Sequence, residues 1–231
     1  MRPIGTYTRR ALEFALRHRW SLPLSLSSSA SLLYLGDEMR GGHLDGIDAR
    51  LMRAVQGWRG SMDGLMVFLT TIGGGVGMTI VSIVVVLWLA RSGWRRAALF
   101  MSIAAVGTWV LSTSLKLIFH RARPVDIRYL VETPASFSFP SGHAMGSMGV
   151  LASGVVVLYA VRAPRALRVL ASVVAGLLAA GIALSRVYLG VHFPSDVLGG
   201  QLAAAAWVSA LTGWFYPRLV PGEQTLAPAH L

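Results

Sequence analysis

The sequence predicts an all-α integral membrane protein, folded as a bundle of six transmembrane helices with both termini in the cytoplasm. Hydrophobic residues make up 54% of the 231 positions and charged residues only 13%, whereas a soluble globular protein carries about 25% charged residues. Apolar runs long enough to cross a bilayer, about 20 residues each, recur along the chain. Short arginine-rich turns connect alternate pairs of these runs, as loops on the cytoplasmic side of a membrane do.

The first apolar run follows a basic head, residues 1–19, which carries five arginines. Residues 20–36 are apolar but rich in serine, and two interpretations are open for them. They form a short first transmembrane helix that is retained, which is the interpretation we favour. Alternatively, they belong to a signal peptide that is cleaved near Ser28-Ser29-Ala30.

A polar segment and a long apolar run come next. In residues 48–58 the apolar side chains recur at helical spacing, which predicts an amphipathic helix on the membrane surface, with ordinary loop packing as the alternative. Residues 62–90 are longer than one span of about 20 residues, so their first part lies along the interface or tilts. Gly73-Gly74-Gly75 permits close helix packing rather than phosphate binding, because no lysine or serine follows at P-loop spacing.

Four further spans complete the predicted bundle, at residues 97–119, 142–161, 169–189 and 196–216. The last helix begins near Pro194, because proline is well suited to the first position of a helix. We expect a single domain over residues 1–231, with its catalytic core at 97–216. The tail, residues 217–231, is polar and expected to be disordered.

Charge placement predicts the orientation of this bundle. Six spans put both termini on one side, which then carries twelve basic and two acidic residues against nine basic and eight acidic residues on the other. The first side is therefore assigned to the cytoplasm of a bacterial-type inner membrane. The net charge of +11 reflects this orientation and does not indicate a nucleic-acid partner. The absence of cysteine excludes disulfides and thiolate metal sites.

Polar residues beside the apolar runs are the candidates for function, because charge within a membrane is expensive. His192 lies just before the last helix, and Asp196 lies in its first turn. The carboxylate can accept a hydrogen bond from one imidazole nitrogen and leave the other free as nucleophile or base. Arg186, about two turns earlier, can hold an anion with its planar guanidinium. The alternative is an interfacial arginine with an incidental helix-capping aspartate.

Two basic residues end the span at 97–119. Lys116 and Arg123 are seven residues apart, so a helix that continues to Pro124 places both on one face as an anion clamp. Basic side chains at span ends also reach for lipid headgroups, which is the alternative. Arg121 then lies on another face as a headgroup contact, and His120 is given no role.

The segment Pro140-Ser141-Gly142-His143 opens the span at 142–161. Ser141 suits an N-cap, Gly142 lets a ligand approach the backbone, and the free N–H groups at a helix N-terminus bind phosphate. His143 can donate a proton to a leaving oxygen. An ordinary helix cap with an interfacial histidine is the alternative. With six spans, all these polar residues fall at the outer face of the membrane.

Together the three clusters resemble the signature of the type 2 phosphatidic acid phosphatase family. That signature is lysine, six residues and Arg-Pro, then Pro-Ser-Gly-His, then Ser-Arg, five residues, His, three residues and Asp. The chain carries every part of it between Lys116 and Asp196. The six-span plan matches the membrane branch of the family. Vanadium haloperoxidases share the signature but are soluble, which this composition contradicts.

The resemblance implies a role for each matching residue. His192 is the nucleophile and forms a phosphohistidine, Asp196 orients it, and His143 protonates the leaving group. The residues implied to hold the phosphoryl oxygens are Lys116, Arg123, Ser141, Gly142 through its N–H, and Arg186. Three cations can take the place of Mg²⁺, so neither a metal nor another cofactor is expected.

The substrate implied is a lipid monophosphate or diphosphate at the outer leaflet, of the undecaprenyl diphosphate, phosphatidylglycerophosphate, phosphatidic acid or lipid A phosphate type. The extra charge of Arg121 and Arg128 favours a diphosphate. We expect the lipid chains to dock between helices near the phosphate site. Two other functions stay open, a lipid phosphotransferase and a non-catalytic protein that binds or transports lipid phosphates. The intact His192, Asp196 and His143 favour an enzyme, and the oligomeric state is unknown.

Overall fold

The computed structural model describes residues 20–125, 130–132 and 135–219, and within these ranges it contains helices and turns but no strand. The prediction of an all-α protein is therefore confirmed. The predicted basic head, Arg128 and residues 220–231 of the predicted tail lie outside the described residues. The helices are α2 (Ser21–Arg40), α3 (Asp45–Gln56), α4 (Asp63–Ile72), α5 (Gly75–Arg91), α6 (Arg95–Phe119), α7 (Gly142–Ala160), α8 (Arg165–Tyr188) and α9 (Pro194–Leu219).

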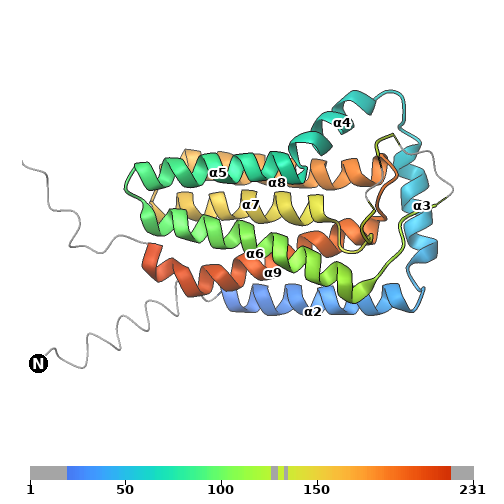
Figure 1. Ribbon diagram of the computed structural model, residues 1–231, viewed down its shortest axis with the longest axis horizontal. Helices are drawn as coiled ribbons and strands as arrows, with labels where there is room; N and C mark the ends of the chain where they lie inside the picture. The colour runs from blue at the N-terminus through green and yellow to red at the C-terminus, as the bar shows by residue number, and fades with distance from the viewer. Residues whose placement is uncertain (1–19, 126–129, 133–134, 220–231) are drawn as a thin grey trace, which may run out of the picture.

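Six of these helices run along the long axis of the molecule, and α3 and α4 lie at one end (Figure 1). Among the described residues, α6, α7 and α8 are long and apolar enough to cross a membrane. The pair α4 and α5, bent by 50° at its break, makes a fourth candidate if the pair is one span. The total of six spans and the side of the termini stay predictions.

The break between α4 and α5 falls at the predicted glycines. A Cβ on Gly73 would lie 2.3 Å from Cγ2 of Ile182, so only glycine lets this point of the chain pack so closely against α8. Gly74 follows in an extended conformation and precedes α5. The predicted role of these glycines in close packing is thus confirmed at Gly73.

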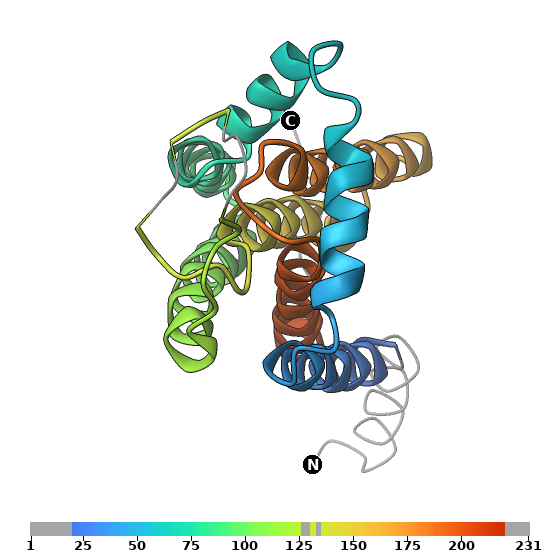
Figure 2. The same ribbon diagram turned by 90° about the vertical axis from the view of Figure 1, so that its right-hand side faces the viewer.

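The predicted amphipathic segment at 48–58 forms α3, which lies across the end of the bundle (Figure 2). It packs on α8 and α9 and buries Asp48 and Met52 there. Leu51 and Trp58 remain about half exposed. The helix is confirmed, while its position at the membrane surface stays a prediction.

The remaining helices pack around α7 and α9, whose small residues allow close contact. A Cβ on Gly107 of α6 would lie 2.2 Å from the Trp207 ring of α9, and one on Gly149 of α7 would lie 2.6 Å from Thr108 Oγ1. Helix α2 packs along α9, with Ser25 Oγ donating to the carbonyl oxygen of Ala206. Helix α9 begins at Pro194 as predicted and continues to Leu219, three residues past the predicted end of the span.

Candidate active site

The predicted site residues lie at helix ends, and the antiparallel run of the helices brings those ends together (Figure 1). Lys116 lies in the last turn of α6, and His143 in the first turn of α7. Arg186 lies in the last turn of α8, and Asp196 in the first turn of α9. All four therefore belong to the end of the bundle that α3 crosses (Figure 2).

His192 lies in the turn between α8 and α9 and is buried, with 2% of its surface exposed. Its Nδ1 lies 3.4 Å from Asp196 Oδ2 and 3.3 Å from Ser138 Oγ. Its Nε2 lies 3.2 Å from Nη1 of Arg123. A guanidinium can only donate, so Nε2 accepts and the proton of the neutral ring sits on Nδ1, facing Asp196. Nε2 therefore carries the lone pair, as a nucleophile requires.

Asp196 is fully buried and its carboxylate is surrounded by donors. Oδ2 accepts from Ser138 Oγ at 2.5 Å and from the Phe193 N–H at 2.8 Å, besides facing His192. Oδ1 accepts from Arg121 Nη1 at 2.8 Å. The predicted pairing of His192 and Asp196 is thus present, and the carboxylate is held in place from several directions.

The surroundings of His192 keep its imidazole neutral. The pKa of His192 is lowered to about 4, mainly by burial and also by the positive charges of Arg123 and Arg186, while Asp196 opposes the shift. At neutral pH the ring is therefore unprotonated at Nε2, which is the state that a nucleophile or base requires.

The expected helix from Lys116 to Pro124 does not form. Helix α6 ends at Phe119 because His120 takes the left-handed conformation, with φ of 49°, and its N–H closes the last turn on the carbonyl oxygen of Lys116. Arg123 therefore reaches the site from a segment without regular secondary structure. The two cations still meet at the loop before α7, where Lys116 donates to the carbonyl oxygen of Phe137 and Arg123 to that of Ser136.

Ser141 and Gly142 begin α7 as predicted, but Ser141 does not cap it with its side chain. The Ser141 N–H donates to the carbonyl oxygen of Asp196 at 2.9 Å, which ties α7 to α9. Its buried Oγ has no hydrogen-bond partner within the described ranges. His143, one residue into the helix, has its Nε2 beside Gly74, where a Cβ would lie 3.4 Å away.

Arg186 is buried, with 3% of its surface exposed. Its Nη1 donates to Thr70 Oγ1 of α4, and its Nε has no hydrogen-bond partner in the described part of the chain. Thr70 was not singled out by the sequence, since nothing in its local pattern connects α4 to α8. An arginine with a donor still available suits an anion better than one that is fully paired.

Arg121 was expected to contact lipid headgroups, and this prediction is wrong. Its Nη2 lies 2.7 Å from Asp48 Oδ2, its Nη1 binds Asp196 and Ser195 Oγ, and its guanidinium lies over the Phe193 ring. Only 10% of its side chain is exposed. The prediction failed because it assumed that α6 continues past His120.

Asp48 and Ser138 are site residues that the sequence did not reveal. Asp48 of α3 is buried, and its Oδ1 accepts from the Ser195 N–H at 3.0 Å, so it caps the start of α9 from another helix. It also accepts from Ser195 Oγ and Arg121. An acidic residue in an amphipathic helix was the available signal for Asp48, while Ser138, in the loop before α7, carried none.

A cavity of about 810 Å³ adjoins this site between α5, α6 and α7. Lys116, Ser136, Gly142 and His143 line one end of it. Along α6 its lining extends from Lys116 to Ser102, fourteen residues or about 21 Å at 1.5 Å per residue. Most of the other lining side chains are apolar, including Met78, Val86 and Trp109. Among the described residues, no group of three or more His, Asp or Glu side chains could hold a metal ion.

Comparison with known proteins places this geometry in a family. The model of the PAP2 superfamily matches residues 96–219. An undecaprenyl-diphosphatase from Sulfolobus acidocaldarius is 34% identical over 157 residues, 66% of this chain and 69% of that protein. Phosphatidylglycerophosphatase B from Bacillus subtilis is 42% identical over 94 residues, and there the match spans only 39% of this chain and 44% of the relative.

The fold has a counterpart among solved structures. The crystal structure of a transmembrane PAP2-type phosphatidylglycerolphosphate phosphatase from Bacillus subtilis superposes with a TM-score of 0.75, covering 90% of this chain and 99% of that one, at 23% identity. At this identity the superposition shows a shared fold, and the class of phosphatases comes from the family and the named relatives. The chain belongs to the PAP2 superfamily, and the predicted resemblance is confirmed.

Proposed function

We propose that the protein is a metal-independent lipid phosphatase, which hydrolyses a lipid monophosphate or diphosphate at the extracytoplasmic face of the membrane through a phosphohistidine. The observation that supports this most is the orientation of His192. Asp196 and Ser138 hold its Nδ1, and its Nε2 faces Arg123 beside a cavity lined by Lys116 and His143.

In the first step Nε2 of His192 attacks phosphorus, and the bond from phosphorus to the leaving oxygen breaks. His143 gives that oxygen its proton and becomes the base for the second step. The ring of His192 becomes positive when it is phosphorylated, and the Asp196 carboxylate stabilises that charge. Arg121 and Asp48 do not touch the substrate and act as positioning residues, because they fix Asp196 and the start of α9.

Lys116, Arg123 and Arg186 hold the phosphoryl oxygens, together with Ser141 Oγ and the Gly142 N–H. Phosphoryl transfer spreads charge over the equatorial oxygens, so preorganised donors carry most of the catalysis. In the second step a water attacks phosphorus, His143 takes its proton, and the bond from phosphorus to Nε2 breaks. Inorganic phosphate leaves and both histidines return to their starting states.

The adjoining cavity supports a lipid rather than a soluble ester as the substrate. Lys116 and His143 line the polar end of this cavity, and mostly apolar side chains line the rest. A chain attached to a phosphate bound at the polar end therefore enters the apolar part directly. Binding of the chain can then lower the barrier at phosphorus. The argument for a diphosphate from Arg121 no longer holds, because Asp48 and Asp196 neutralise that arginine. The named substrates of the relatives include both a diphosphate and a monophosphate.

Two alternatives make distinct predictions. A phosphotransferase would pass the phosphoryl group from His192 to an acceptor lipid, and it would release inorganic phosphate only when the acceptor is absent. A non-catalytic protein would bind lipid phosphates and release none. The position of Asp196 beside Nδ1 of His192, 3.4 Å away, favours an enzyme, because binding requires cations but no oriented nucleophile.

Released phosphate from a panel of lipid phosphates and diphosphates tests the proposal. Purified wild type should release phosphate and, after quenching with labelled substrate, should carry an acid-labile phosphate label. His192→Ala should do neither. Near-normal turnover by His192→Ala would overturn the assignment of the nucleophile. For the membrane side, single cysteines at Glu132 and Ala163 can be labelled on intact cells with an impermeant thiol reagent, since the chain has no native cysteine. Only the cysteine at position 132 should react.

A further inference from the structure

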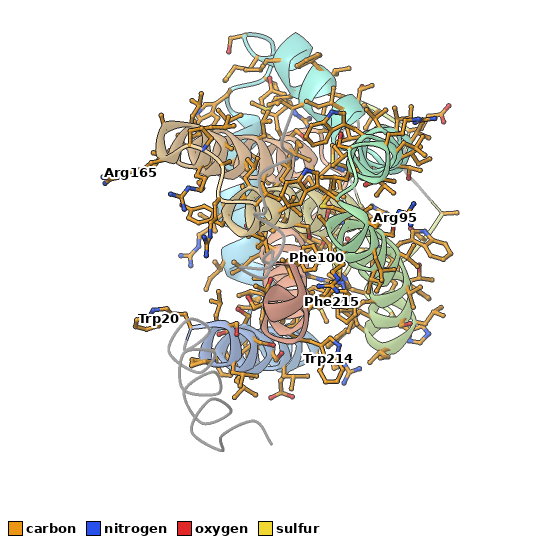
Figure 3. The ribbon with its side chains drawn as sticks, turned by 90° about the vertical axis from the view of Figure 1, so that its left-hand side faces the viewer. Trp20, Arg95, Phe100, Arg165, Trp214 and Phe215 are labelled. Atoms are coloured by element: carbon orange, nitrogen blue, oxygen red, sulfur yellow. The ribbon has the colours of Figure 1, made fainter. Side chains whose placement is uncertain are left out.

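A second cavity lies at the opposite end of the bundle from the active site. Its volume is about 530 Å³, and its lining comes from α2, α7, α8 and α9. Trp20 before α2, Tyr159 near the end of α7 and Thr212 near the end of α9 mark its outer end. Figure 3 looks onto this end, and Trp20 and Arg165 point outward there on the same side of the molecule.

The dimensions of this groove match one lipid chain of one leaflet. On α7 its lining extends from Met148 to Tyr159, eleven residues or about 16 Å. That is about half of the ~30 Å hydrocarbon core of a bilayer. The rim is open, because Trp20, Leu24 and Tyr159 are 70%, 51% and 40% exposed. An acyl chain from the surrounding lipid can therefore enter from the side.

The outer end of the groove is strongly positive. The turn from α7 to α8 carries Arg162, and the first turn of α8 carries Arg165 and Arg168. The guanidinium of Arg168 lies over the Tyr159 ring, 4.9 Å from its centre, and Tyr159 itself lines the groove. The buried Nε of Arg168 has no hydrogen-bond partner among the described residues. A donor and a cation thus stand at the mouth of an apolar groove.

No acidic side chain in the described residues stands at this end to balance these arginines. All acidic residues of the described ranges lie towards the end of the bundle that holds the candidate active site. They are Asp37, Glu38, Asp45, Asp48, Asp63, Glu132 and Asp196. Residues 1–19 are a poor occupant, because they carry five arginines and one glutamate and would repel this turn. The complementary charge is therefore expected from outside the chain.

We propose that this groove binds an anionic phospholipid. One acyl chain lies between α2 and α8, and the phosphodiester accepts hydrogen bonds from Arg168 and Arg165. A guanidinium binds a phosphate with two parallel hydrogen bonds, and its stacking on Tyr159 holds Arg168 at the groove. The site is separate from the substrate site, since its lining shares no residue with the cavity beside His143.

Quenching of Trp20 fluorescence by brominated lipids tests this site. The protein is placed in phosphatidylcholine bilayers that contain the same fraction of brominated phosphatidylglycerol or brominated phosphatidylcholine. The signal of Trp20 is the difference between wild type and Trp20→Phe. Brominated phosphatidylglycerol should quench this signal more strongly, and Arg168→Gln should weaken that preference about fivefold, as expected for one arginine near an anionic lipid. Arg165→Gln provides the same measurement if Arg168→Gln does not fold.

Two controls separate a bound lipid from general attraction. Arg95 is exposed at the same end but on the other side of the bundle (Figure 3), so Arg95→Gln should leave the preference unchanged. A Cβ on Gly176 meets nothing within 4 Å, so Gly176→Leu fills the groove without a clash and should reduce quenching. Gly154→Leu, at an equally open glycine outside the groove, should not. Equal quenching by the two lipids, equal effects of Arg95→Gln and Arg168→Gln, or full quenching in Gly176→Leu would each overturn the proposal.

Discussion

The apolar cavity beside the phosphate site can be blocked by a single substitution. Gly146 of α7 lines this cavity one turn after His143, and a Cβ built on it meets nothing within 4 Å. Gly146→Leu therefore places a side chain in the path of the lipid without a clash. A Cβ built at this position meets no side chain of the predicted phosphate-binding residues within 4 Å, so the substitution should leave the chemistry at phosphorus intact.

The size of the effect follows from the volume that the new side chain occupies. Leucine adds four carbons and displaces about three or four methylene groups of the substrate, each worth about 0.8 kcal/mol on burial. The loss of about 2.4–3.2 kcal/mol corresponds to a decrease of kcat/KM of about 60- to 200-fold. A water-soluble phosphate ester does not reach into the cavity, so its kcat/KM should not change.

The assay is kcat/KM for a long-chain lipid phosphate in mixed micelles beside that for a soluble ester. Gly154→Leu is the matched control, because it makes the same change at an open glycine of α7 that does not line the cavity. Unchanged activity of Gly146→Leu on the lipid would refute a chain bound in this cavity. An equal loss on both substrates would instead show damage to the phosphate site.

Other perturbations test the remaining parts of the site. Asp48→Asn leaves Asp196 as the remaining carboxylate that accepts a hydrogen bond from Arg121. The value of kcat should therefore fall about tenfold, which corresponds to about 1.36 kcal/mol, while KM stays constant. A change in KM alone would contradict the positioning role. The pKa of buried His192 is about 4 against an ordinary 6.5, so the folded state binds fewer protons than the unfolded state between these values. The free energy of unfolding therefore contains the full contribution of neutral His192 above pH 6.5 and falls by roughly 3 kcal/mol as the pH is lowered to 4. Thermal unfolding of His192→Gln should lack this pH dependence. If the variant keeps the same dependence, other groups cause it. Activity should survive excess EDTA and be inhibited by vanadate, and activity that is lost in EDTA and restored by Mg²⁺ would contradict catalysis by protein cations alone.

The sequence was sufficient to predict that the candidate site residues lie together, because each is within a turn or two of a helix end. Pro194 marks the start of α9, so it located both His192 and Asp196 relative to that helix. Likewise Ser141 and Gly142 begin α7 where the motif places them. Antiparallel helices joined by short turns then put alternate ends at the same level. Local signals for helix ends are thus sufficient to bring distant polar residues to one end of a bundle.

The partners of these residues could not be predicted in the same way. Arg121 binds Asp48, which is 73 positions away, and Asp48 binds Ser195, which is 147 positions away. Neither contact has a local signal, since it depends on α3 lying across the end of the bundle. The error on Arg121 came from a single residue, because the left-handed conformation of His120 ends α6 and changes the direction of every side chain up to Pro124.

The contrast of Arg121 with Arg123 and Lys116 separates a structural cation from the proposed phosphate-binding cations. Arg121 donates to the carboxylates of Asp48 and Asp196, so its charge is balanced within the protein. Arg123 donates to the carbonyl oxygens of Ser136 and Val191, and Lys116 to that of Phe137. A carbonyl oxygen orients a cation without neutralising it. When a phosphate binds, Lys116 can exchange its neutral acceptor for a charged one, which forms the stronger hydrogen bond. The carbonyl oxygen of Phe137 therefore holds Lys116 in position and leaves its charge for the proposed substrate.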